Sequence, residues 1–104
     1  DYYKKDKQAI RRAAEFSHEK YPYQKVIALG LVSKVYNYYD RGARLYDRHR
    51  DLSSGDTTKS VIVTSFEWSV SPHNRELLER RCRLEKYFPS AGPPELHVKV
   101  YYCE

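Results

Sequence analysis

The two cysteines, Cys82 and Cys103, are the residues whose type and spacing point most directly to chemistry. They stand at the outer ends of two segments, "CRLEKYF" and "ELHVKVYYC", that flank "PSAGPP". If these segments pair as an antiparallel hairpin, the cysteine Cα atoms can approach to the roughly 4.4–6.8 Å that a disulfide requires. Closing a loop of about 20 residues would stabilise the fold by roughly 3 kcal/mol. We therefore favour a disulfide over the alternative, two reduced cysteines in a cytosolic domain.

Other chemistry finds little support in the spacing of the polar residues. The four histidines are scattered, whereas a zinc site usually contains one close Cys or His pair. A nucleophilic cysteine would need a base and an orienting group beside it. The aspartates between residues 47 and 56 do not have the spacing of a calcium-binding loop with its glycine and closing glutamate. We expect no catalytic residues, no cofactor and no metal.

Length and composition predict one small domain that spans residues 1–104. Nineteen Lys and Arg against fourteen Asp and Glu give a formal net charge of +5, which favours polyanions weakly and without specificity. The longest apolar run, "VIALGLV", has seven residues, far fewer than the roughly 20 that span a bilayer. We expect no membrane insertion, and the absence of methionine and of an apolar leader suggests a processed chain.

The elements that must position the cysteines begin with a helix from Asp6 to Lys20, whose apolar residues recur at helical spacing. Pro22 ends it, because proline lacks the donor that a helix needs. The β-branched residues and tyrosines that follow predict a long strand over 25–39 and a second over 43–50. "DRG", Asp40 to Gly42, is then the turn of a hairpin.

Two further elements complete the expected fold. "SVIVTSFEWSV", residues 60–70, alternates as a strand, and Ser71-Pro72 is typical of a helix start, with serine as the cap. In the last hairpin, opposition of the cysteines would place Leu84 and Phe88 on the face away from Val98 and Val100, and a bulge or a small offset would restore a shared apolar face. "NRELLERRCRLEKYF" also has strong helix propensity, which competes with the strand over 82–88.

One helix, four antiparallel strands and a last hairpin with two cysteines resemble the cystatin superfamily. The residues that carry the resemblance are "AIRRAAEFSHEKYP", "KVIALGLVSKVYNYYDRGA", "KSVIVTSFEWSV" and "RCRLEKYFPSAGPPELHVKVYYC". It covers Gln8 to Cys103 and rests on pattern, with no diagnostic motif. The resemblance implies an α+β fold in which an N-terminal helix packs on a curved four-stranded antiparallel sheet.

The departures from inhibitory cystatins bear on function. Those proteins block papain-like peptidases with an N-terminal glycine, a Gln-x-Val-x-Gly loop and a Pro-Trp loop. Here the first loop is "NYYDRG", in which Gly42 alone matches, and the second is "FPSAGPPE", with Pro89 but no tryptophan. Desolvating Asp40 and Arg41 at the tip of a wedge would be costly. The latexin-like and cathelicidin pro-domain-like branches therefore fit better.

The sequence thus predicts a secreted, non-catalytic, cystatin-like binding module. Its partner would be a protein, with a peptidase as the first specific hypothesis. The alternatives are a polyanion, either a glycosaminoglycan or a nucleic acid, and a structural matrix module that pairs through an edge strand. The candidate residues are Tyr38, Tyr39, Asp40, Arg41, Gly42, Pro89, Ser90 and Gly92 in the loops and Arg44, Arg48 and Arg50 on a basic face.

Overall fold

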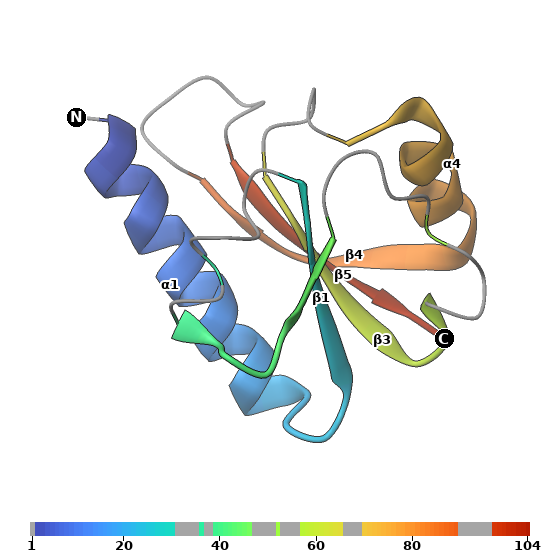
Figure 1. Ribbon diagram of the computed structural model, residues 1–104, viewed down its shortest axis with the longest axis horizontal. Helices are drawn as coiled ribbons and strands as arrows, with labels where there is room; N and C mark the ends of the chain where they lie inside the picture. Colours follow the sequence, from blue (N-terminus) through green and yellow to red (C-terminus); the bar gives the residue numbers. More distant parts are fainter. Residues whose placement is uncertain are drawn as a thin grey trace.

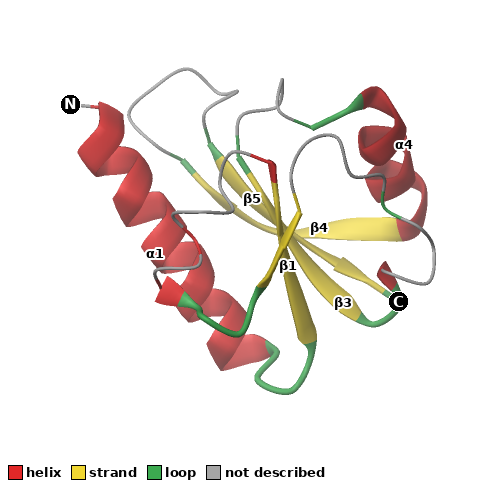
Figure 2. Cartoon of the chain, viewed as in Figure 1, coloured by secondary structure: helices red, strands yellow, loops and turns green. Residues whose placement is uncertain are grey.

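A mixed five-stranded sheet with a helix on each face forms the fold (Figures 1 and 2). The computed structural model describes residues 2–30, 36, 39–46, 52, 57–65, 70–89 and 97–104. The elements are α1 (Tyr2–Lys20), β1 (Lys25–Leu29), β2 (Arg44–Tyr46), β3 (Ser60–Thr64), α4 (Pro72–Arg81), β4 (Cys82–Phe88) and β5 (Val98–Cys103). The α+β class expected from the sequence is confirmed.

The expected set of four antiparallel strands is wrong. The strand order is β2-β1-β3-β5-β4, and β1 pairs in parallel with both β2 and β3. Strand β5 is antiparallel to β3 and to β4. Strands β1 to β4 therefore run in one direction, and β5 alone runs in the other.

The hairpin expected around Asp40–Gly42 is also absent, because β2 lies parallel to β1. Gly30, with φ 84°, ends the extended run after only five residues of β1. A positive φ of this kind is easy for glycine and breaks a strand. Tyr36 and Tyr39, expected in the long strand, are helical, and the Asp40 N–H donates to the Tyr36 carbonyl at 3.0 Å. Two parallel strands are joined by a longer crossover connection rather than by a tight turn.

Both faces of the central strands are buried. Val26, Ala28, Val61 and Val63 pack under α1, while Ile27, Leu29 and Ile62 point to the α4 side. Strands covered on both faces are typically continuous apolar runs, as "VIAL" and "VIV" are here. The α4 side is completed by the side chains of Tyr46, Leu52, Val70, Leu78 and Cys103.

The predicted first helix is confirmed, and it begins at Tyr2, four positions before the expected start. Ala13 and Ala14 are 0% and 2% exposed, because their small side chains let the helix lie close against the sheet. Ser17 is buried in the same stripe and donates from its hydroxyl to the Ala13 carbonyl at 2.9 Å. The helix ends at Lys20, just before Pro22.

The predicted start of the second helix is confirmed as well. The Ser71 side chain caps α4 by accepting the N–H of Asn74 at 3.2 Å, and Pro72 occupies the first turn. Asn74 is fully buried, and its Oδ1 accepts the Leu52 N–H at 2.7 Å. None of the helices within the described ranges is long and apolar enough to cross a membrane.

The disulfide and the bulge of the last hairpin are both confirmed. Cys82 is bonded to Cys103, with their Cα atoms 4.1 Å apart. The register shifts between Leu84 and Lys86, so that Phe88 comes to oppose Val98. Phe88 now packs on the α1 side, at 6.0 Å from the ring of Phe16, while Leu84 stays 50% exposed opposite Tyr101.

Removing the disulfide should lower the free energy of unfolding. The Cys82→Ser/Cys103→Ser variant, in which the linked positions are 21 residues apart, is expected to lose about 3 kcal/mol because the unfolded chain regains loop entropy. Urea unfolding of the variant and of the wild type checks this, with and without reductant. Identical midpoints for the oxidised wild type and the variant would show that the bridge adds no stability.

Candidate functional site

The side chains of four strands form ordered rows across the α4 face of the sheet. One row runs Leu29, Thr64, Lys99 and Tyr87, and the next runs Ile27, Ile62, Tyr101 and Leu84. Residues in register on neighbouring strands are close enough to interact. The β1 and β3 ends of these rows are buried and apolar apart from Thr64, whereas the β5 and β4 ends are polar or exposed.

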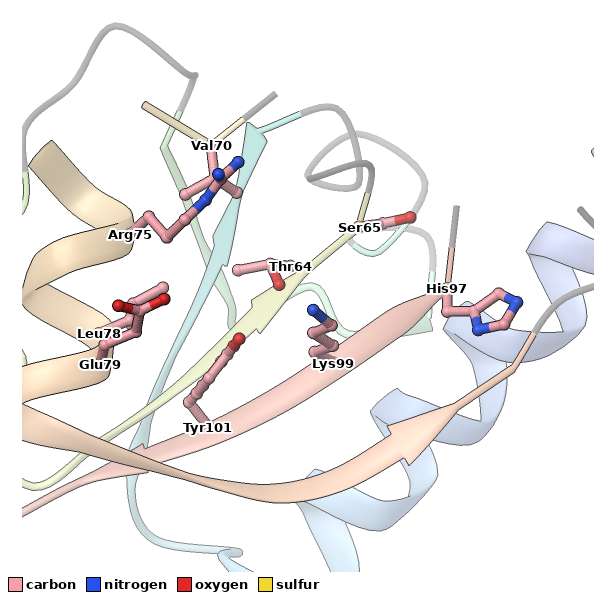
Figure 3. A pocket seen from close by; sticks show the side chains of 9 residues that line it. All are labelled: Thr64, Ser65, Val70, Arg75, Leu78, Glu79, His97, Lys99 and Tyr101. Carbon is pink, nitrogen blue, oxygen red and sulfur yellow. The ribbon is translucent and has the colours of Figure 1, made fainter. Parts of the chain in front are cut away.

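A cavity of about 240 Å³ lies where α4 meets this face, beside the end of β3 and the start of β5. Figure 3 shows Arg75 and Glu79 entering from α4, while Thr64, Lys99 and Tyr101 rise from the sheet. Val70 and Leu78 supply its apolar lining, and Ser65 and His97 stand at its far side. A concave, partly apolar pocket with a few convergent polar groups is the usual form of a ligand site.

The polar groups of the cavity suit an anion. Arg75 and Lys99 bring positive charge from two separate elements, and Thr64, Ser65 and Tyr101 add hydroxyl groups that can donate hydrogen bonds. Glu79 is the single acidic side chain in the lining. The side chains that line the cavity thus include two cations and one carboxylate, the latter at the α4 side.

The imidazole of His97 points away from the centre of the cavity in Figure 3. Its Nδ1 is hydrogen-bonded to the hydroxyl of Tyr87. The two rings meet edge to face, with centroids 5.0 Å apart and planes at 70°. His97 therefore fixes the orientation of Tyr87, which stands next to Lys99 across the β4–β5 pairing.

We expected the loops at Asp40–Gly42 and at Pro89 to share one end of the sheet, but they lie at opposite ends. The Asp40–Gly42 turn precedes β2, at the edge where the parallel strands begin. Pro89 follows β4, which runs parallel to β3, so it lies at the edge where those strands end. The cavity shares this second edge, where ligands of open α/β sheets commonly bind.

The Asp40–Gly42 turn has an internal structural explanation. Asp40 is 6% exposed, and its Oδ1 accepts the Gly42 N–H at 3.1 Å, as in an Asx turn. The same oxygen lies 3.4 Å from Nε2 of His18 on α1. Arg41 is exposed, and Tyr39 is half-buried against α1. Asp40 is thus tied to the fold, and Arg41 is the side chain that this turn presents to solvent.

The predicted basic face is only partly within the described residues. Arg44 is exposed at the start of β2, two positions before the buried Tyr46 on the same face. It is in register with Ile27, so Ile27 and Ile62 separate it from Tyr101. Arg48 and Arg50, the remaining residues of this face, lie outside the described residues. So do three of the predicted loop residues, Tyr38, Ser90 and Gly92.

Neither Arg75 nor Lys99 was among the site residues predicted from the sequence. A signal for Lys99 was present, because it is the one charged residue of "VKVYYC" and alternation puts it on the same face as Tyr101. No comparable signal marked Arg75, because it is one of several arginines on a charged helix. Only the packing of α4 against the sheet brings Arg75 and Lys99 to one cavity.

A second charged cluster, on the α1 face, is satisfied internally. The carboxylate of Glu85 accepts hydrogen bonds from the Tyr21 hydroxyl, from Lys20 Nζ at 3.0 Å and from Arg83 Nε at 3.0 Å. Tyr21 stacks on Tyr102 at 4.5 Å. The hydrogen bond from Tyr21, followed by those from Lys20 and Arg83, lowers the pKa of Glu85 to about 2. This cluster ties β4 to the end of α1.

Metal chemistry has no candidate ligand set in the described part of the chain, where no group of three or more His, Cys, Asp or Glu side chains could hold an ion. Comparison with known protein families, with curated proteins and with solved structures finds no match for the chain. The function is therefore argued from the cavity and its surroundings.

The Glu85 cluster makes a testable contribution to stability. Because the folded pKa, about 2, lies below the ordinary value near 4.5, the stabilisation is complete above pH 4.5 and is lost as the pH falls towards 2. Glu85→Gln should lower the free energy of unfolding at pH 7 by about 2 kcal/mol, as expected for hydrogen bonds to a charged group. Urea unfolding of the variant and of the wild type should converge at pH 2.

Glu15→Gln is the matched control, because Glu15 is an exposed partner of Arg11 on α1. Glu15→Gln should lower the free energy of unfolding by less than about 0.5 kcal/mol at either pH. A Glu85→Gln effect that is the same at pH 7 and pH 2 would contradict the assignment of this stability to the ionised carboxylate.

Proposed function

We propose that this chain is a non-catalytic binding domain that holds an anionic group, phosphate or sulfate, in the cavity between α4 and the sheet. The observation that carries the proposal is the convergence of Arg75 and Lys99, from α4 and β5, on one cavity of about 240 Å³. Guanidinium and ammonium groups, together with hydroxyl donors, are the usual partners of such oxyanions. The net charge of +5 would favour the approach of a polyanion from a distance.

The disulfide supports an extracellular setting for this domain, because such bonds persist mainly in oxidising compartments. It also suits a binding role. Cys82 and Cys103 hold together the two strands that carry the polar end of the α4 face. A rigid scaffold reduces the ordering cost that binding must overcome.

Replacement of the two cations should weaken anion binding selectively. Lys99→Ala and Arg75→Ala are each expected to lower affinity for inorganic polyphosphate about tenfold at low salt, and to flatten the salt dependence, because a phosphate contact is lost. Titration calorimetry at two salt concentrations measures both effects.

The matched controls are Lys86→Ala and Arg12→Ala. Lys86 lies on the same β4–β5 ribbon but is in register with Val100 of the α1 face, and Arg12 is exposed on α1. Each control removes the same charge as its counterpart and should change affinity less than twofold. Equal losses for Lys86→Ala and Lys99→Ala would show that net charge alone attracts the polyanion, and the proposed site would be rejected.

The resemblance to cystatins supports a second candidate function, inhibition of a peptidase. A helix across a sheet and a disulfide-closed terminal hairpin are the features that favour it. Because Asp40–Gly42 and Pro89 lie at opposite ends of the sheet, contact would be made through one loop at a time. The Asp40–Gly42 turn is the stronger choice, because Arg41 is exposed there.

This second candidate predicts that a peptidase inhibited by the wild type regains its full rate with Gly42→Trp. Gly42 is not in the left-handed region, and an added Cβ would meet only Asp40 Oδ1, at 3.6 Å. The fold should therefore tolerate the change. Tyr23→Trp, at a residue that is 97% exposed, is the control. Uninhibited cysteine peptidases and metallopeptidases in an excess of the wild type would reject the candidate.

A further inference from the structure

We propose that the anion held in the cavity is a phosphate of a single-stranded nucleic acid, and that an adjacent base stacks on Tyr87. This inference rests on the proposed anion site and adds the class of ligand. It is based on two exposed side chains of β4, Leu84 and Tyr87, that lie directly beside the cavity. We call this pair the ledge.

The pairing of β4 with β5 joins the ledge to the cavity. Tyr87 is in register with Lys99, and Leu84 is in register with Tyr101; both β5 partners line the cavity. Neighbouring strands lie about 4.8 Å apart, so the side chains of Tyr87 and Lys99 leave the sheet about one strand spacing from each other. An aromatic platform next to a cation is the combination that binds single strands, through stacking of the base and contact with its phosphate.

The ledge is exposed enough to bind and ordered enough to stack. Leu84 is 50% exposed and Tyr87 is 39% exposed, and they are two of the four large exposed hydrophobic residues among those described. The Tyr87 hydroxyl is hydrogen-bonded to His97, and the ring contacts the imidazole edge to face. This contact fixes the ring before binding, so less side-chain entropy is lost when a base stacks on it.

The charges favour a nucleic acid over a densely sulfated glycan. Two cations, Arg75 and Lys99, share the cavity lining with the carboxylate of Glu79. A ligand that brings several sulfates would be repelled by Glu79, whereas a nucleotide brings one phosphate per base. Glu79 can instead accept a hydrogen bond from an N–H group of a base, such as the ring N3–H of thymine or the amino group of cytosine. The lining thus matches a ligand with both an anion and a hydrogen-bond donor.

A single strand fits this surface better than a duplex. Bases in a duplex are already stacked on one another, so the Tyr87 ring could not reach their faces without unpairing them. Single-stranded ligands offer free faces, and stacking of this kind tolerates different base sequences. We therefore expect affinity to depend on the presence of bases more than on their order.

The test compares two oligomers that differ only in their bases: a labelled 12-nucleotide dT strand and an abasic deoxyribose-phosphate strand of the same length. Fluorescence anisotropy with the complete chain should show about tenfold tighter binding of the dT strand, as expected for one stacked base. Tyr87→Ala should remove this preference and leave affinity for the abasic strand unchanged. Lys99→Ala should weaken binding of both strands.

Two further variants control the result. Tyr87→Phe keeps the ring and should retain at least part of the preference for the dT strand, and Tyr23→Ala removes a tyrosine that is 97% exposed elsewhere and should have no effect. The comparison of the two strands on the wild type needs no variant, so it decides the question even if Tyr87→Ala does not fold.

Equal affinity of the wild type for the dT and abasic strands would overturn the inference while leaving the anion site intact, provided that Lys99→Ala still weakens both. A heparin oligosaccharide that binds more tightly than the dT strand and is insensitive to Tyr87→Ala would likewise assign the cavity to sulfated glycans. If Lys99→Ala binds both strands as tightly as the wild type does, the proposed anion site itself is rejected.

Discussion

The register of β4 on β5 is the constraint on which the arrangement of the surface depends. Because successive side chains of a strand point to opposite faces, a slip of one residue would exchange the α1 and α4 faces of the whole strand. The bond between Cys82 and Cys103 fixes one end of this register, and the bulge between Leu84 and Lys86 resets it halfway along. The bulge lets Glu85 face the end of α1 while Tyr87 still falls beside Lys99.

The cavity follows from how the two helices cover the sheet. Helix α1 packs closely against one face through the small side chains of Ala13 and Ala14 (Figure 1). Helix α4 is shorter and packs with Leu78 against the other face, near the β4 side of the sheet in Figure 1. Its polar side chains Arg75 and Glu79 therefore meet the polar end of the strand rows. The cavity therefore lies at the edge of the part of the sheet that α4 covers.

Local signals in the sequence were sufficient for some elements and insufficient for others. The stripe of α1, the Ser71 cap and the cysteine pairing depend on residues close in the chain or on one hairpin, and all three were predicted correctly. The parallel pairing of β1 with β2 was missed, because alternation and β propensity do not distinguish parallel from antiparallel strands. The signals present were the apolar run "VIAL", typical of a strand buried on both faces, and Gly30, which ends it.

The candidate site was harder to predict than the fold, because net charge does not tell where a charge is used. On the α1 face, Lys20 and Arg83 surround the half-buried carboxylate of Glu85, and the contact with Lys20 joins α1 to β4. On the α4 face, Arg75 and Lys99 line a cavity. All four are ordinary basic residues in the sequence, and neither their neighbours nor their spacing separates the two uses. The difference lies in the tertiary packing: the bulge in β4 turns Glu85 towards Lys20, whereas the packing of α4 against the sheet brings Arg75 and Lys99 to the cavity.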